Sequence, residues 1–240
     1  MKTLLSITAM IIVAAIMGTG CSKDSNPSDK MPMLTVTDID GNVYQTIQIG
    51  SQTWMAENLK STALNDGTPL ELFTFTPDND RWFLASTTAP MYTWPFTGDL
   101  NNLHDEELPR DFYGAIYSHA AIESGRLAPE GWRIPAETDF LELMSFLANN
   151  GFGGAESSAL CSEEGWAVEN GTNSTGFNGL PNGYCTISGS ATGTQAVATF
   201  CSSARQEDKR KLLNLIPQEN FSEFTENDIR FGAGIRCIKD

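Results

Sequence analysis

Residues 35–60 read TVTDIDGNVYQTIQIGSQTWMAENLK, and the interpretation of the whole chain starts from them. Apolar and polar side chains alternate from Val43 to Ile49, which is the period of a half-buried β-strand. The DGN sequence ending at Asn42 and the glycine at Gly50 are typical of the turns that join such strands. The segment therefore predicts strand, turn, strand, followed by a further short strand.

Three more strands are predicted near the other end of the chain, over residues 212–216, 221–224 and 234–238. The last of these is available to pair with the opening strand, 43–49. Between the two ends, a long segment over residues 151–193 holds ten of the 21 glycines. This composition favours shaped loops over regular structure.

Two helices are predicted between the strands. Residues 112–125 are rich in Ala and Ile and end at a glycine, and residues 137–150 place apolar side chains on one helix face. The second helix follows Pro135 and carries Glu137 and Asp139 in its first turn, where the helix dipole favours acidic groups. Strands, two helices, a looped middle and more strands make the fold class α+β.

The chain has 240 residues and carries 15 Lys and Arg against 30 Asp and Glu, a formal net charge of −15. An excess of acid repels phosphate backbones and anionic lipid headgroups. We therefore expect no nucleic-acid partner, and no adhesion to membranes through basic side chains.

Residues 1–20 have the organisation of a bacterial lipoprotein signal peptide. Lys2 supplies the positive charge, residues 4–17 are apolar, and small residues precede Cys21. We expect acylation of Cys21, followed by a flexible tether over residues 21–33. The SKD sequence after Cys21 resembles a signal for the outer face of the outer membrane. The chain is thus predicted to be a cell-surface lipoprotein that contacts the membrane through this lipid alone; the alternative is an ordinary secretory signal.

Four further cysteines, an even number in an exported chain, permit two disulfides. Two strands around a turn centred on residue 193 would place Cys185 opposite Cys201, which leaves Cys161 to pair with Cys237. The alternative is that some of them remain buried thiols. No CxxC motif is present and the chain has only two histidines, so we expect no metal site.

Six sequence blocks follow one another along the chain: TVTDIDGNVYQTIQIGSQTWMAENLK, NDGTPL, YGAIYSHA, LAPEGWRIPAETDF, TNSTGFNGLPNGY and GAGIRCIKD. Together they resemble the Fibrobacter succinogenes major paralogous domain, which predicts one domain over residues 34–240. The resemblance implies a C-type-lectin-like fold, with two helices, a small mostly antiparallel sheet closed by the N- and C-terminal strands, and long irregular loops. The family commonly has a cysteine before the PxGW block, paired with the cysteine of the last strand. Here that position is Ala128, so Cys237 needs a new partner or stays free.

The chain contains no nucleophile elbow, P-loop or dinucleotide fingerprint after the leader. We therefore expect no catalytic residues and no cofactor, and predict a non-catalytic domain that binds an extracellular glycan or protein. The ligand-binding candidates are Trp166, Asn170, Asn173, Asn178 and Asn182, because aromatic rings stack on sugars and amides bond their hydroxyls. Alternatively, asparagine occurs there because turns need positive φ.

Two other functions remain open. The chain could be an adhesion or assembly subunit that binds protein without binding glycans. A glycan-active enzyme ranks last, because two suitably spaced carboxylates occur by chance in so acidic a chain. Glycan binding through the loops predicts that Trp166→Ala weakens retention on polysaccharide and leaves the melting temperature nearly unchanged.

Overall fold

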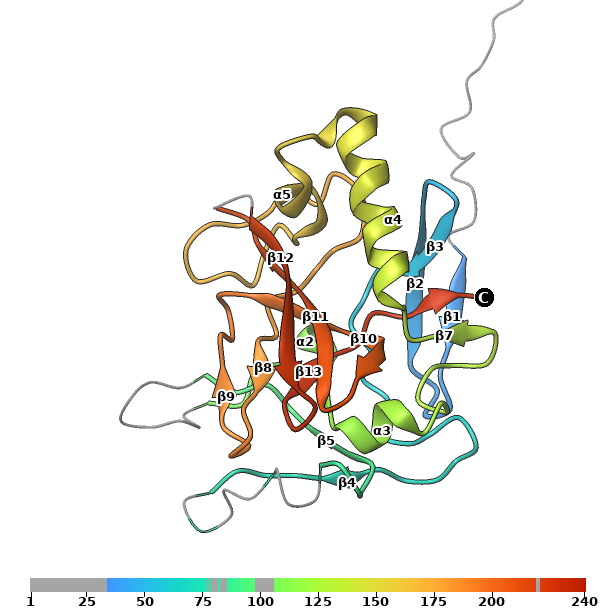
Figure 1. Ribbon diagram of the computed structural model, residues 1–240, viewed down its shortest axis with the longest axis vertical. Coiled ribbons are helices and arrows are strands. Elements are labelled where there is room, and N and C mark those ends of the chain that lie inside the picture. Colours follow the sequence, from blue (N-terminus) through green and yellow to red (C-terminus); the bar gives the residue numbers. More distant parts are fainter. Residues whose placement is uncertain (1–33, 77, 79–81, 83–85, 98–105, 219–220) are drawn as a thin grey trace, which may run out of the picture. The chain divides into compact units, whose positions relative to one another are not determined.

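The computed structural model describes residues 34–76, 78, 82, 86–97, 106–218 and 221–240. These residues form two β-sheets and four α-helices (Figure 1), so the α+β fold class is confirmed. The predicted leader, Cys21 and the tether lie outside the described residues. None of the described helices is both long enough and apolar enough to cross a membrane.

The first sheet joins the start and the end of the described chain. Its strands, in spatial order, are β1 (Thr35–Thr37), β2 (Val43–Ile49), β3 (Gln52–Met55), β14 (Ile238–Lys239) and β7 (Trp132–Arg133). Every neighbouring pair is antiparallel. The expectation that the terminal strands share a sheet is confirmed (Figure 1). The direct partner of the last strand is β3, with Ile238 opposite Trp54, rather than β2.

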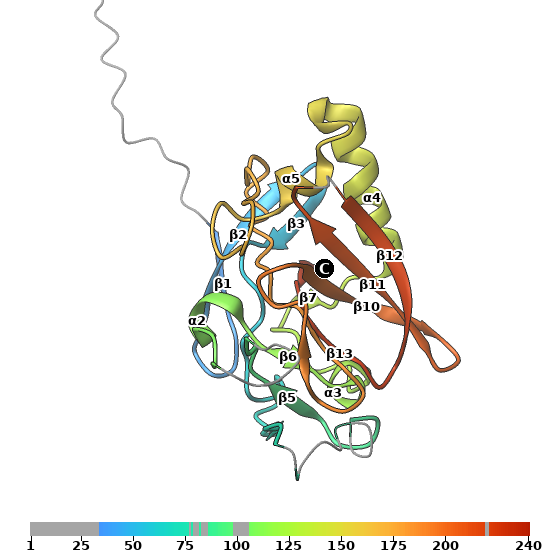
Figure 2. The ribbon, with the colours of Figure 1, turned by 90° about the vertical axis from the view of Figure 1, so that its left-hand side faces the viewer.

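The second sheet is larger than the small sheet that was predicted. Its order is β12 (Phe221–Asp228), β11 (Lys209–Ile216), β10 (Ala198–Gln206), β13 (Gly232–Gly234), β6 (Ile116–Tyr117), β5 (Met91–Thr93) and β4 (Glu71–Leu72), and the pair β8 (Tyr184–Cys185) and β9 (Ala191–Thr192) joins it at β13. The three long strands β10, β11 and β12 lie side by side as an antiparallel ribbon (Figure 2).

The strand predicted over residues 234–238 is two strands. Gly234 ends β13 in the second sheet, and Ile238 begins β14 in the first. The three residues between them are fully buried and carry the chain from one sheet to the other. The sheets are thus joined directly through the core.

Helix α4 (Glu137–Leu147) confirms the second predicted helix. Its N-terminus is closed by Asp139, whose carboxylate accepts the backbone N–H of Ala136 at 2.6 Å. Its buried face packs on the core, where Phe140 stacks on Trp54 with ring centroids 5.5 Å apart. The helix continues into a π-helical turn, η1 (Ala148–Phe152), and α5 (Glu156–Leu160) follows.

The single helix predicted over residues 112–125 is wrong. Two short helices, α2 (Arg110–Tyr113) and α3 (His119–Glu123), lie on either side of strand β6. Between them Gly114 adopts a φ of 73°, and a Cβ at this position would lie 2.6 Å from Cβ of Asn58. The chain must turn here, so the Ala- and Ile-rich composition is divided between the buried strand β6 and the short helix α3.

The four cysteines predicted to form disulfides are buried free thiols: Cys161, Cys185, Cys201 and Cys237. The predicted register is wrong, because Cys185 lies opposite Ala191 and Cys201 lies opposite Leu212. The chain reverses between β8 and β9 rather than at residue 193, and β10 takes β11 as its antiparallel partner. Burial raises the pKa of Cys161, Cys201 and Cys237 to about 12 and also raises that of Cys185.

Candidate functional site

Residues 161–183, which we call the loop segment, hold the five predicted ligand-binding residues. Among them Trp166 is half-buried, with its ring packed against the apolar cluster beneath α4. Its indole N–H donates to Oγ of Ser162 at 2.9 Å. Replacing Trp166 would remove this packing as well as any ligand contact, which conflicts with the expected unchanged melting temperature.

Asn173 and Asn178 are the two candidates that the structure brings into contact. Both adopt left-handed backbone conformations, with φ of 45° and 56°. Oδ1 of Asn173 accepts the backbone N–H of Asn178 at 2.8 Å. At both positions the structure supports the alternative interpretation, in which asparagine occurs because the turn needs it.

The remaining two candidates lie in opposite environments. Asn182 is fully buried, and its Oδ1 accepts the backbone N–H of Thr199 at 3.3 Å. Its amide nitrogen would lie only 2.0 Å from a Cβ at Gly234, so only glycine fits there. Asn170 is exposed. The five residues therefore do not form one platform for a ligand.

Arg236 holds the loop segment to the rest of the core. This side chain is fully buried and donates to the carbonyl oxygens of Phe177 at 2.5 Å, Asn178 at 2.9 Å and Met55 at 3.2 Å. Its guanidinium carbon lies 4.7 Å from the ring centroid of Phe177 and 5.2 Å from that of Phe200. Burial lowers the pKa of Arg236 to about 9. These contacts give Arg236 a structural role.

A depression of about 260 Å³ lies on one face of the second sheet, and we call it the sheet groove. It is lined by Tyr184, Val197, Leu212, Asn214, Ile216, Thr225 and Asn227. The alternation of β11 places positions 212, 214 and 216 on the same face, and the register sets Leu212 opposite Thr225 on β12. Neighbouring strands thus bring polar and apolar side chains to a common surface.

The polar side chains of the sheet groove are linked across three strands. The hydroxyl of Thr199 on β10 donates to Oδ1 of Asn214 on β11 at 3.0 Å. The amide of Asn214 donates to Oγ1 of Thr225 on β12 at 3.0 Å. The amide of Asn227 donates to the same Oγ1 at 2.7 Å. This ladder fixes the orientation of each side chain before any ligand arrives.

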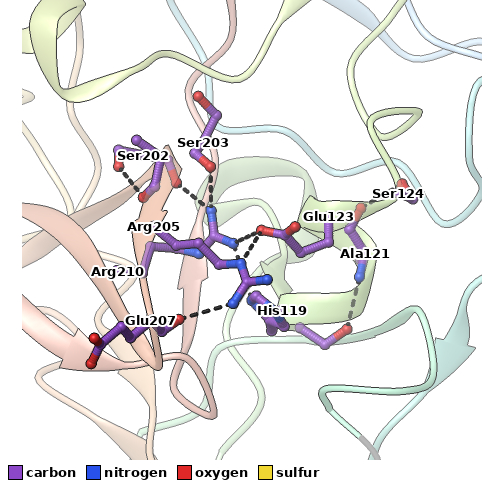
Figure 3. Close-up of polar contacts among 11 residues, drawn as sticks. His119, Ala121, Glu123, Ser124, Ser202, Ser203, Arg205, Glu207 and Arg210 are labelled. Carbon is purple, nitrogen blue, oxygen red and sulfur yellow. Dashed lines mark hydrogen bonds and ion pairs between the residues drawn. The ribbon is translucent and has the colours of Figure 1, made fainter.

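Charged side chains gather at the other end of the same sheet face, where α3 meets the hairpin of β10 and β11 (Figure 3). We call Arg205, Arg210, His119 and Glu123 the hairpin cluster. The buried guanidinium of Arg210 donates to Nδ1 of His119 at 3.0 Å and to the carboxylate of Glu123. It also donates to the carbonyl oxygens of Ser202 and Ser203, both at 2.8 Å, where the strand register shifts.

The hairpin cluster is arranged for structure rather than chemistry. Arg205 approaches Glu123 at 3.5 Å, so two guanidinium groups surround one carboxylate (Figure 3). Burial and the charge of Arg210 lower the pKa of His119, which favours the neutral ring that accepts a hydrogen bond from Arg210. In the described part of the chain, no group of three or more His, Cys, Asp or Glu could hold a metal ion.

Sequence reasoning missed the residues of the sheet groove. The predicted strand 212–216 contained Asn214, and strand alternation could have placed it on one face with Leu212. The strand predicted over residues 221–224 ended one residue before Thr225 and so excluded both Thr225 and Asn227. Residues 225–228 are all polar, so no apolar–polar alternation marked the continuation of the strand.

The chain is an α+β domain, because it combines two largely antiparallel sheets with helices packed on the core. More specifically, the chain belongs to the Fibrobacter succinogenes major domain family, whose model matches residues 47–239. The resemblance given by the six sequence blocks is therefore confirmed. No curated protein and no solved structure shows significant similarity to the chain.

Proposed function

We propose that this chain is a cell-surface lipoprotein whose domain binds an extracellular ligand in the sheet groove and performs no covalent chemistry. The observation that carries this proposal is the composition of the groove: an aromatic ring and apolar side chains face amides and a hydroxyl that are already fixed in place. A concave surface with few, well-oriented polar groups is typical of ligand sites.

The lining also favours binding over catalysis. No carboxylate, imidazole, thiol or amine lines the groove, so the hydroxyls of Tyr184 and Thr225 have no base in the lining to activate them for nucleophilic attack. The charged hairpin cluster lies on the same sheet face, but its groups bond one another and the backbone. A glycan-active enzyme is therefore the less favoured alternative.

The C-type-lectin-like architecture is part of the same proposal. It is supported by the common sheet of the opening and closing strands and by the irregular loop segment. The proposed location is the outer membrane, with exposure at the cell surface and a lipid at Cys21 as the membrane contact. Mass spectrometry of the mature N-terminal peptide tests the lipid attachment at Cys21. An unmodified Cys21 would refute the lipid anchor.

The binding proposal is tested by applying the full mature chain to arrays of glycans and of extracellular proteins. We expect saturable binding, which Val197→Arg weakens by about tenfold or more, because the longer side chain fills the groove and brings a charge for which the lining offers no counter-charge. The control is Val168→Arg, at a position that is 82% exposed in the loop segment. Absence of binding on both arrays, or release of a reaction product, would contradict the proposal.

A protein partner is the second candidate, and one observation favours it. Leu34, Ile39 and Val43, all in or beside the opening hairpin, are 65%, 49% and 53% exposed. Several exposed large apolar side chains in one short hairpin favour a contact with a partner protein. An adhesion or assembly subunit predicts that a partner co-purifies with the chain and is lost with Val43→Lys, while no glycan binds.

A further inference from the structure

Three hydrogen-bonding positions in the sheet groove remain available to a ligand. Oγ1 of Thr225 accepts amide N–H groups from Asn214 and Asn227, so both lone pairs are occupied and the hydroxyl still has a proton to donate. Asn227 retains its Oδ1 as an acceptor, and Asn214 retains a second amide N–H. Within the described residues, no bond from another side chain occupies any of these three positions.

The remaining lining of the groove is apolar. It consists of Tyr184, Val197, Leu212 and Ile216, and on β11 the last two flank Asn214. The ring of Tyr184 packs against Phe231, with centroids 5.9 Å apart, which limits its movement. A ligand ring with an apolar C–H face can lie against these side chains while its edge reaches the hydrogen-bonding atoms.

The side chains that line the groove do not favour a charged ligand. The lining contains no ionised side chain, although the whole chain has a net charge of −15. An anion would find no free counter-charge in the lining, because the nearest cation by register, Arg210 opposite Asn227, is buried and already bonds Glu123 and His119. A cation would lose its hydration without gaining a carboxylate partner. An uncharged ligand therefore suits the groove best.

The size of the groove limits how much of a ligand it can hold. Its volume of about 260 Å³ lies just below the range of roughly 300–1,000 Å³ that is usual for small-molecule sites. The groove thus accommodates one ring of a longer molecule rather than several.

We propose that the sheet groove binds one ring of a neutral saccharide chain, with Thr225 and Asn214 as donors and Asn227 as acceptor. This inference rests on the proposed function, that the domain binds an extracellular ligand in this groove. A peptide side chain could contact the apolar side chains, but it would leave Thr225 and Asn227 without partners, which weakens binding. A ring that carries hydroxyl groups matches both the apolar and the polar side chains of the lining.

The test measures binding of the full mature chain to three kinds of probe: neutral oligosaccharides, acidic polysaccharides and a panel of extracellular proteins. Isothermal titration calorimetry then gives the affinity for the neutral probes. We expect wild-type protein to bind neutral oligosaccharides and to discriminate against the acidic ones.

Two groove variants locate the site. Thr225→Val keeps the shape of the side chain and removes the hydroxyl donor, and we expect it to weaken affinity by about tenfold. Asn227→Asp should have a similar effect, because the new carboxylate accepts the proton of Thr225 and places a negative charge in the groove. The matched controls are Thr192→Val and Asn170→Asp, both at exposed positions, which should bind like wild type.

The possible failures of the two proposals are distinguishable. Binding only to acidic polysaccharides or only to proteins overturns the neutral-saccharide inference and leaves the proposed binding function standing. Neutral binding that is unchanged in both groove variants also overturns it, because the site then lies elsewhere. Binding to none of the probes contradicts the proposed function itself. The melting temperature of each variant is measured alongside its affinity. If Thr225→Val lowers the melting temperature, the affinity of Asn227→Asp decides whether the groove is the binding site.

Discussion

The loop segment and the sheet groove contain similar side chains, an aromatic ring together with several amides, but they use them differently. In the loop segment, Asn173 accepts the backbone N–H of Asn178 in the same loop, and Asn182 accepts that of Thr199 near the start of β10. In the sheet groove, the backbone of β11 and β12 is paired along the whole ladder. The amides of Asn214 and Asn227 therefore bond other side chains and keep atoms free.

The difference follows from how each region satisfies its backbone. A buried N–H or C=O group must find a partner, and a loop without a ladder recruits side chains for this purpose. A sheet supplies the partners itself. Polar residues on a paired sheet face are thus better candidates for ligand contacts than polar residues in an ordered loop, although loops are usually considered first.

The largest effect should come from breaking the attachment of the loop segment to the core. Arg236→Leu removes the donors for three buried carbonyl oxygens, and we expect it to lower the free energy of unfolding by about 4 kcal/mol. Chemical denaturation measures this. The control is Arg230→Leu, a half-exposed arginine paired with Asp228, which should cost less than about 1 kcal/mol. Similar losses in both variants would contradict the structural role of Arg236.

A direct comparison of one amide from each region should give the next largest effect. Asn182→Ala leaves the N–H of Thr199 buried without its acceptor, and we expect a loss of about 2 kcal/mol of stability. Asn227→Ala in the sheet groove should cost less than about 1 kcal/mol and instead weaken ligand binding. Urea denaturation of the two variants measures both losses of stability. Equal losses of stability would mean that the two regions do not differ in the way described.

The left-handed turn at Asn178 allows a sharper distinction between backbone and side-chain roles. We expect Asn178→Val to cost about 1–2 kcal/mol, because a β-branched residue is strained at a φ of 56°. Asn178→Gly should stay within about 0.5 kcal/mol of wild type, since glycine adopts this conformation freely. Thermal unfolding of both proteins tests the pair. A large loss with glycine would show that the amide side chain matters more than the turn.

The smallest expected effect concerns the charged end of the sheet face. The folded protein lowers the pKa of His119, through burial first and then through Arg210, with Glu123, Arg205 and Asp208 also acting on it. Between this lowered pKa and the ordinary value of 6.5, the unfolded chain binds more protons than the folded one. Stability should therefore fall as the pH falls below about 6.5.

Denaturation at pH 7.5 and at pH 5.5 measures this dependence. The variant His119→Gln lacks the titrating group, so it should lose less stability than wild type over the same interval. The comparison is between two pH values within each protein, which cancels any constant cost of the substitution. An identical pH dependence in both proteins would remove His119 as its cause.

The fold could be predicted from the sequence where a pattern was local. The alternation at residues 43–49 identified β2, and the apolar face with Asp139 at the start identified α4. In the second sheet, the strands predicted over residues 212–216 and 221–224 are parts of β11 and β12. Several other strands of this sheet escaped because they are only two residues long, which leaves no period to detect. The break at Gly114 depends on contact with Asn58, which is distant in sequence.

The sheet groove could not be derived from local patterns for a similar reason. Its lining depends on which residues of β12 lie opposite β11, and strand register is fixed by long-range pairing. The predicted loop residues were chosen by composition alone, because aromatic and amide side chains suit sugars. Composition did not reveal that Trp166 packs on the core or that Asn182 is buried.

The four buried thiols make local opening of the protein measurable. Alkylating reagents attack thiols that are both exposed to solvent and ionised. In the folded protein all four thiols are buried and their pKa values are raised, so neither requirement is met. Each cysteine reports on a different part: Cys161 on the base of the loop segment, Cys185 on β8, Cys201 on the long ribbon and Cys237 on the crossing between sheets. The labelling rate of each cysteine would show which part of the domain opens locally most often and which part opens only when the whole domain unfolds.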